Sequence, residues 1–251
     1  MCTLTILPYN NKIFVGFNRD ELRTRKTAIP PSFYVYNNIK MIYPKDANFG
    51  GTWIGANELG FLFFLLNYNQ KNLYKNYFFN KAYKNKKSRG LIIPELLKLE
   101  SEEQIHEYIQ NFDYWNYSPF RLIFFNVNNL KVLQFIYSGR GKKTRCYSIP
   151  FFQASSGLGD QKIYPLRKKL FNTLLQNQPS IKKQIRFHHY RNKKNPLKNI
   201  FVNRKLARTV SQTFILIENQ QIMMHYLDHL NKKKHKYILN LKTRSNIRGS
   251  F

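Results

Sequence analysis

Cys2 has the type and the position that offer the clearest chemistry in this sequence. It directly follows Met1, so removal of Met1 would leave one residue with both a thiol and a free α-amine. A nucleophile and its own base would then share one position, as in the N-terminal-amine variants of nucleophilic catalysis. The amine's reference pKa of about 7.7–8.0 suits proton transfer near neutral pH. The alternative is that Cys2 is a small buried hydrophobic residue at the head of a strand.

The residues that follow Cys2 predict a β-hairpin. Thr3–Leu7 and Lys12–Phe17 are rich in β-branched and aromatic residues, and residues 8–11 between them are typical of a turn. A turn centred on residues 9–11 pairs positions whose numbers sum to about 20. This register predicts that Cys2 lies opposite Asn18.

Two charged residues directly beyond this pair could assist the chemistry of Cys2. Asp20 could hold the ammonium group of the new amino terminus. Arg19 could favour the thiolate or bind a substrate carboxylate. The arrangement therefore predicts that the pKa of the Cys2 thiol lies below the value of about 8.5 for a free cysteine.

Further elements must support this hairpin, and the sequence predicts an α+β fold. The expected helices are Gly90–Lys98, Glu102–Asn111 with Ser101 as its N-cap, and Tyr164–Leu175. The expected further strands are Leu122–Val127, Val132–Tyr137, Thr213–Glu218, Gln221–Leu227 and Lys236–Leu241. Strand pairs around a helical middle fit a layered sandwich, and without a linker or repeat we expect one domain over residues 1–251.

Several motifs resemble those of the NRDE family, also called the transport and Golgi organisation protein 2 family. The resemblance rests on the second-position cysteine, on NRDE at 18–21, on GGTWIG at 50–55, on LNY at 66–68 and on SRG at 88–90. Ala207-Arg208-Thr209 is a weaker match. The strong matches thus lie in the first 90 residues.

That family is similar to N-terminal nucleophile hydrolases of the choloylglycine hydrolase and penicillin V acylase group. The resemblance implies stacked antiparallel β-sheets flanked by helices, with no cofactor. It implies that Cys2 cleaves a small non-peptide amide, that Asp20 orients the amine of Cys2, and that Asn67 donates a hydrogen bond to the oxyanion. Arg19 lies two residues from the position where the group carries an arginine.

Three other residues are candidates for substrate binding. Asn18 belongs to the NRDE motif, and Arg208 could play the same electrostatic role as Arg19. Trp53 is the third candidate, although its place between two glycines is more typical of a core residue.

One departure from the resemblance weakens the prediction of hydrolysis. Relatives tend to carry Ser-Asn in a loop before a helix, whereas this chain has Ser156 in the place of that Asn. A hydroxyl reaches less far than an amide, so an oxyanion donor is missing there. The alternative is a non-catalytic binding or trafficking protein for haem or lipid on the same scaffold, since eukaryotic members of the family are associated with Golgi organisation, lipid homeostasis and haem movement. Cys2 or a histidine could then ligate haem.

The charge of the chain is strongly positive. It carries 42 Lys and Arg against 13 Asp and Glu, a net charge of +29. Such a bias can indicate nucleic-acid binding. However, no common nucleic-acid-binding motif is present, and the basic runs, including Lys182–Lys198, fall in predicted surface loops. We therefore expect a small-molecule amide or an anionic apolar ligand as the partner, and no nucleic acid.

The remaining composition narrows the protein class. No apolar run approaches the roughly 20 residues that span a bilayer, so we expect no transmembrane segment. No signal peptide precedes Cys2, and the cytoplasm is the expected location. With only Cys2 and Cys146, neither a disulfide framework nor a metal site is predicted.

Overall fold

Two stacked antiparallel β-sheets form the centre of the protein. The computed structural model describes residues 2–70, 86–176 and 179–242. The first sheet contains β1 (Cys2–Tyr9), β2 (Lys12–Leu22), β10 (Phe151–Ala154), β11 (Ala207–Glu218), β12 (Gln221–Asp228) and β13 (Lys233–Asn240). The second contains β3 (Ile29–Tyr36), β4 (Ile39–Lys45), β5 (Ile54–Asn57), β6 (Phe61–Asn67), β7 (Phe120–Asn126), β8 (Lys131–Tyr137) and β9 (Lys142–Ser148). The strand orders are β10-β1-β2-β11-β12-β13 and β3-β4-β5-β6-β7-β8-β9.

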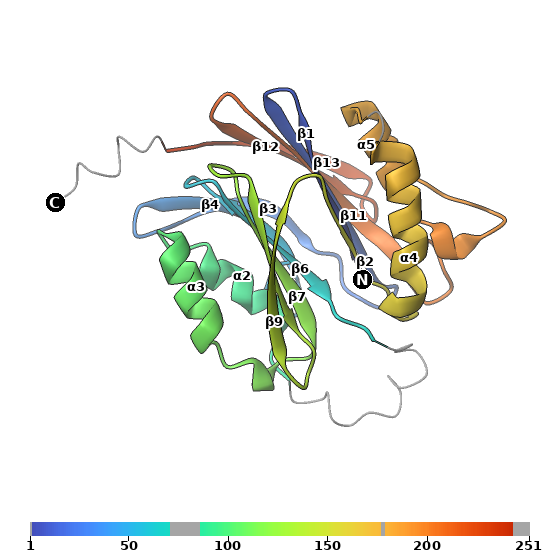
Figure 1. Cartoon of the computed structure of the whole chain (residues 1–251), viewed down its shortest axis with the longest axis horizontal. Coiled ribbons are helices and arrows are strands. Elements are labelled where there is room, and N and C mark those ends of the chain that lie inside the picture. Colours follow the sequence, from blue (N-terminus) through green and yellow to red (C-terminus); the bar gives the residue numbers. More distant parts are fainter. Residues whose placement is uncertain (1, 71–85, 177–178, 243–251) are drawn as a thin grey trace.

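Helices cover the outer face of each sheet (Figure 1). The helices α2 (Ile92–Leu96) and α3 (Glu102–Asn111) pack on the second sheet, and α4 (Asp160–Phe171) and α5 (Ile181–His188) pack on the first. Shorter helical turns are Arg89–Leu91, Tyr114–Asn116, Asn172–Gln176 and Pro196–Lys198. The molecule is therefore a sandwich of helices, sheet, sheet and helices, which confirms the predicted α+β class.

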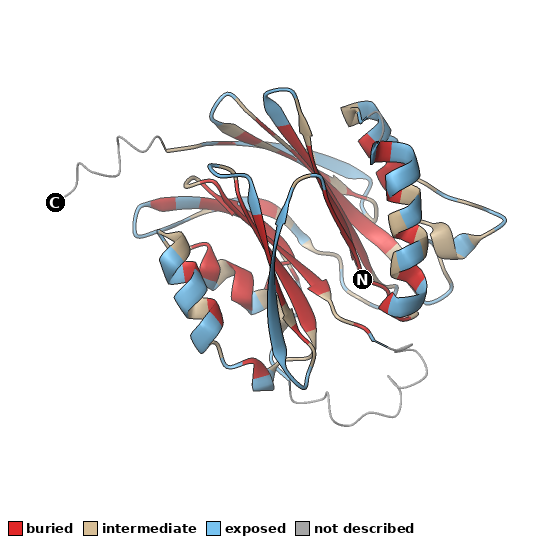
Figure 2. Cartoon of the chain, in the orientation of Figure 1, coloured by how far each residue is buried: buried red, intermediate tan, exposed pale blue. Residues whose placement is uncertain are grey.

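The alternation of side chains along each strand divides the core into three layers. Leu4 and Ile6 on β1 and Val15 and Phe17 on β2 face the second sheet and belong to the central apolar cluster. Leu7 points the other way, into a cluster with residues of α4 and α5. A third cluster lies between the second sheet and α2 and α3. Figure 2 shows the buried residues concentrated along these contact faces.

The predicted hairpin at the amino terminus is confirmed, but its register differs by one residue. Tyr9 pairs with Lys12 across a two-residue turn in which Asn10 has a φ of 51°, so Cys2 pairs with Arg19. The prediction that Asn18 lies opposite Cys2 is wrong, because a three-residue turn was assumed. The observed turn is tighter, and asparagine tolerates the left-handed conformation that it requires.

Other elements also differ in part from the predictions. The helix Glu102–Asn111 is confirmed, and the Ser101 hydroxyl accepts a hydrogen bond from the Gln104 amide at 3.3 Å. The basic run Lys182–Lys198, predicted as a loop, contains most of α5, which the Ser180 side chain caps. The helix predicted from Tyr164 begins four residues earlier, at Asp160. Among the helices of the described ranges, none combines the length and apolar character that crossing a bilayer requires.

Candidate active site at Cys2

Cys2 is the first residue of β1 and lies at the end of the first sheet where β10 and β2 flank it. Its backbone nitrogen donates a hydrogen bond to the Ser155 hydroxyl at 3.1 Å, and its carbonyl accepts one from the Ser155 nitrogen at 2.9 Å. Its side chain is 6% exposed and joins the apolar cluster between the sheets. Met1 lies outside the described residues. The nitrogen that would become the free amine of Cys2 therefore already has an acceptor.

Arg19 lies beside Cys2 in the neighbouring strand, and other side chains hold its guanidinium. Its Nη2 is 2.7 Å from Oδ2 of Asp46 and 3.5 Å from Oε2 of Glu21. The guanidinium also stacks on the Trp53 ring, 4.0 Å from its centroid. The sequence predicted Arg19 one residue beyond the position opposite Cys2, and the observed register places it directly opposite Cys2. Its partner Asp46 carries no sequence motif and was not predicted.

Trp53 is a core residue in this structure. It is 6% exposed and packs in the central apolar cluster, where its ring supports Arg19. It presents almost no surface to a ligand, so its assignment to substrate binding is not supported. The alternative interpretation, a core residue between two glycines, agrees with its burial.

The environment of the Cys2 thiol opposes ionisation. Burial raises the pKa of the thiol above its ordinary value, and the carboxylates of Asp20 and Glu21 act in the same direction. The guanidinium of Arg19 lowers the pKa but does not outweigh the burial. The expectation of a lowered thiol pKa is therefore wrong for the folded chain, because a charge that is already paired with Asp46 cannot replace lost hydration.

Asn18 and Asp20 face the opposite side of β2 from Arg19, because side chains alternate along a strand. The Asn18 amide donates to the His188 carbonyl at 2.8 Å and to the Ile200 carbonyl at 3.0 Å, beneath α5. Asn18 is fully buried in this polar network. The structure thus places the Asn18 side chain on the face of β2 away from Arg19, and nothing in this network supports its assignment to substrate binding.

Asp20 is buried near the end of the same strand. Its Oδ1 accepts a hydrogen bond from the Thr209 hydroxyl at 2.6 Å. Burial raises the pKa of Asp20, while the charge of Arg167 on α4 lowers it. Asp20 is close enough to influence the pKa of the Cys2 thiol, although its side chain leaves β2 on the other face. The end of β2 thus brings the charge of Asp20 near Cys2.

Arg208 lies at the same end of the sheet. It pairs with Glu21 across β11 and β2, and Glu21 in turn contacts Arg19. Its Nε is buried and has no hydrogen-bond partner among the residues that the structure describes. Arg208 therefore lies at the same end of the first sheet as Arg19, and its role in substrate binding stays a prediction.

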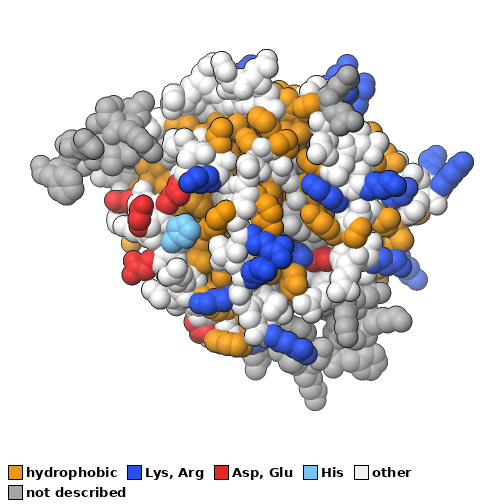
Figure 3. Space-filling view, in the orientation of Figure 1, with side chains coloured by type: hydrophobic (Ala, Val, Ile, Leu, Met, Phe, Trp, Pro, Cys, Tyr) orange, Lys and Arg blue, Asp and Glu red, His pale blue; other side chains and the backbone are white. Residues whose placement is uncertain are grey.

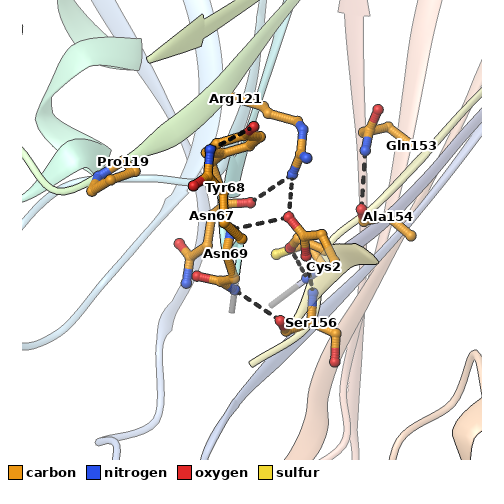
Figure 4. Close-up of polar contacts among 12 residues, drawn as sticks. Cys2, Asn67, Tyr68, Asn69, Pro119, Arg121, Gln153, Ala154 and Ser156 are labelled. Carbon is orange, nitrogen blue, oxygen red and sulfur yellow. Dashed lines mark hydrogen bonds and ion pairs between the residues drawn. The ribbon is translucent and has the colours of Figure 1, made fainter. Parts of the chain in front are cut away.

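Two asparagines lie near Cys2 at the end of β6: Asn67 is the last residue of the strand, and Asn69 follows two residues later (Figure 4). The carbonyl of Asn67, the predicted oxyanion donor, accepts a hydrogen bond from Arg121 at 3.1 Å. The side-chain amide of Asn69 donates to the Ser156 carbonyl at 3.1 Å, and Asn69 is only 3% exposed. Asn69 was not predicted, although its place two residues after Asn67 could have suggested a second amide at the strand end. It supplies an amide to the very loop in which Ser156 replaces the expected asparagine.

Asp160 at the start of α4 connects these segments. Its Oδ1 accepts from the Ser156 nitrogen at 2.7 Å. Its Oδ2 accepts from the Asn69 nitrogen at 3.0 Å and from Nη1 of Arg121 at 2.6 Å. Since Ser155 holds both backbone groups of Cys2, one buried carboxylate fixes the loop that carries Cys2 against the end of β6.

The chain is similar in architecture to solved structures of a conjugated bile acid hydrolase and of an N-acylethanolamine-hydrolyzing acid amidase. A mutant of the conjugated bile acid hydrolase from Clostridium perfringens matches 97% of this chain and 97% of its own, with 10% identity and a TM-score of 0.58. The N-acylethanolamine-hydrolyzing acid amidase orthologue from Caenorhabditis elegans matches 86% of this chain and 92% of its own, with 13% identity and a TM-score of 0.55. At such low identity the likeness shows the fold alone, which is that of the N-terminal nucleophile hydrolases.

Sequence comparison identifies the family. A search of curated protein sequences gives no significant match. The family model for Transport and Golgi organisation 2 matches residues 1–233. This match includes the hairpin with Cys2 and Asn18–Glu21, the Trp53 segment and most of the first sheet. The chain therefore belongs to the Transport and Golgi organisation 2 family.

Proposed function

We propose that the protein is an amidohydrolase that acts on a small non-peptide amide with Cys2 as its amino-terminal nucleophile. The observation that carries this proposal is the position of Cys2 at the start of β1 in this fold, with its nitrogen 3.1 Å from the Ser155 hydroxyl. Removal of Met1 would convert that nitrogen into a free amine that already has the Ser155 hydroxyl as a hydrogen-bond acceptor. The hydrolase-like scaffold and the small-molecule substrates of similarly folded enzymes support the proposal.

In the proposed reaction the amine of Cys2 takes the thiol proton as the sulfur attacks the amide carbonyl. A C–S bond forms, and an amide N–H of Asn67 or Asn69 donates to the oxyanion. The amine then gives its proton to the leaving nitrogen as the C–N bond breaks, which leaves a thioester. Water, deprotonated by the same amine, then attacks the thioester carbonyl. The C–S bond breaks, the acid is released, and the ammonium returns its proton to the Cys2 sulfur.

The raised pKa of the thiol fits this sequence of proton transfers. Because burial keeps the thiol protonated at rest, the amine must remove the proton during the attack rather than before it. Asp20 would favour the protonated form of the amine through its charge, and Arg19 would favour the thiolate. Arg19 and Arg208 would also attract an anionic group of the substrate.

The second candidate is a carrier for haem or lipid on the same scaffold, which would also act in the cytoplasm. Two observations favour it: the thiol lies protonated in an apolar cluster, and the loop lacks the expected asparagine. A buried soft sulfur could ligate haem iron without any hydrolysis. The two candidates predict opposite outcomes for the same substitution.

Cys2→Ser tests the proposal, and Cys146→Ser is its matched control, since Cys146 is an exposed cysteine on β9. Wild type and both variants are assayed against acyl amides such as penicillin V, N-acyl homoserine lactones and conjugated bile acids, and are titrated with haem. Turnover that Cys2→Ser abolishes and Cys146→Ser preserves supports the hydrolase. Saturable haem binding without turnover would establish the carrier, and an intact mass that retains Met1 would rule out the free amine.

A further inference from the structure

The helical layer on the first sheet carries many basic residues and almost no acids, and the helical layer on the second sheet carries nearly half of the acids of the chain. Residues 161–217 contain fourteen Lys and Arg and no Asp or Glu, whereas six of the thirteen acids lie within residues 95–113. The first segment contains α4 and α5 on the outer face of the first sheet. The second contains α2 and α3 on the outer face of the second sheet. Figure 3 shows acidic side chains over α3 on the left, and mainly Lys and Arg on the right.

Seven exposed cations form what we call the cationic face. They are Lys162 and Lys169 on α4, Lys182 and Arg186 on α5, and Arg191, Lys193 and Lys194 after α5. None of the ion pairs within residues 2–70, 86–176 and 179–242 includes any of these seven side chains.

The packing of the helices turns these charges outward. α5 buries Gln184, Phe187 and His188 against the first sheet, which leaves Lys182 and Arg186 towards solvent. The acid at the start of α4, Asp160, is buried and paired with Arg121, so it does not neutralise the face. The cationic charge of this layer is thus uncompensated at the surface.

We propose that the cationic face docks the protein onto an anionic membrane surface, independently of any reaction at Cys2. Clustered lysines and arginines on an amphipathic helical surface are attracted to anionic lipids. The acidic helices α2 and α3 lie on the far side of the molecule, and an anionic membrane repels them. This repulsion favours the orientation in which the cationic face contacts the membrane. Leu174, between α4 and α5, is 38% exposed and offers an apolar side chain to the lipid interface.

The same face is a poorer match for nucleic acid. Proteins that bind single strands present aromatic rings on which bases stack. In this layer Tyr164, Tyr190 and Phe201 are half-buried, and the Phe201 ring is occupied by His189 on one side and by the Arg191 guanidinium, 4.3 Å from its centroid. Five of the seven cations are lysines, which act as point charges rather than as the bidentate donors that read bases.

Vesicle co-sedimentation of the full chain tests the proposal. Wild type is mixed with phosphatidylcholine vesicles and, separately, with vesicles that also contain phosphatidylserine. The salt concentration is about 0.1 M, at which charges within about 10 Å of each other still interact. The test variant reverses three charges of the cationic face: Lys182→Glu, Arg186→Glu and Lys193→Glu. The matched control reverses three exposed charges at β8 and β9: Lys131→Glu, Arg140→Glu and Lys143→Glu. Circular dichroism confirms that both variants are folded.

We expect wild type to bind only the vesicles with phosphatidylserine, and the test variant to lose about tenfold or more in affinity. The control should lose less than about threefold, because its charges lie outside the face although its net charge is the same. Equal losses in both variants would show that net charge alone drives binding and would overturn the proposal. The proposal would also be overturned if wild type did not bind the vesicles. It would be overturned as well if a short DNA duplex bound the protein more tightly than the vesicles and displaced it from them.

Discussion

Replacement of Asp160 by asparagine tests whether one buried carboxylate positions Cys2. The carboxylate accepts hydrogen bonds from the Ser156 nitrogen, the Asn69 nitrogen and Arg121, at 2.7, 3.0 and 2.6 Å. Asp160→Asn preserves the size of the side chain but leaves only one oxygen. Since an amide NH₂ group cannot accept, at least one of these donors loses its partner, and Arg121 loses its counter-ion.

The structure sets the expected magnitude. Arg121 is 8% exposed and Asp160 5% exposed, so water cannot easily replace the lost contacts. Breaking a buried ion pair costs about 3–5 kcal/mol, and the retained oxygen of asparagine reduces this, so we expect a loss of about 2–4 kcal/mol in the free energy of unfolding. Arg121→Met should cost a similar amount. The double variant should lose about 1–3 kcal/mol less than the sum, because both changes remove one shared interaction.

Urea unfolding and the alkylation of Cys2 by iodoacetamide, in a Cys146→Ser background, provide the assay. Asp228→Asn is the control, because this buried carboxylate accepts from the Leu230 and Asn231 nitrogens at 2.9 and 3.0 Å but lies on β12, which β2 and β11 separate from β1. Asp160→Asn should loosen the loop at Ser155 and accelerate the alkylation of Cys2 several-fold, whereas Asp228→Asn should not. Equal alkylation in both variants, together with additive effects of Asp160 and Arg121, would refute the positioning role.

Two further predictions concern the polar network beneath α5. A Cβ at Gly16 would lie 2.3 Å from Nε2 of His188, so Gly16→Ala should lower the free energy of unfolding by about 1–3 kcal/mol, while Gly141→Ala, with no atom within 4 Å, should change it little in the same urea titration. Burial lowers the pKa of His188 to about 3, below the ordinary value of 6.5. Between pH 6.5 and 3 the unfolded chain therefore binds a proton that the folded chain excludes. The contribution of His188 to the free energy of unfolding is complete above pH 6.5. It falls between pH 6.5 and 3 by at most about 1.4 kcal/mol per pH unit. Wild type should accordingly lose more stability than His188→Gln between pH 7 and pH 4.5, and parallel losses would contradict a neutral buried His188.

Local patterns in the sequence determined the scaffold of the site. Runs rich in β-branched and aromatic residues predicted β1 and β2, and the turn residues between them predicted that they form a hairpin. Because a hairpin joins neighbours in the sequence, it placed Arg19 beside Cys2 within one residue of the correct register. The same local patterns predicted α3 and its Ser101 cap.

Tertiary structure decided which of these residues share a face and what surrounds them. A turn shorter by one residue moved Asn18 from the pair with Cys2 to the network beneath α5, because each shift of one residue reverses the face. Ser155 reaches Cys2 across 153 positions of sequence, and no local pattern encodes such a contact. Burial between two sheets, which composition cannot reveal, raised the pKa of the Cys2 thiol against the effect of Arg19. The sequence therefore determined which residues are candidates, and the packing of distant segments determined their charge, partners and exposure.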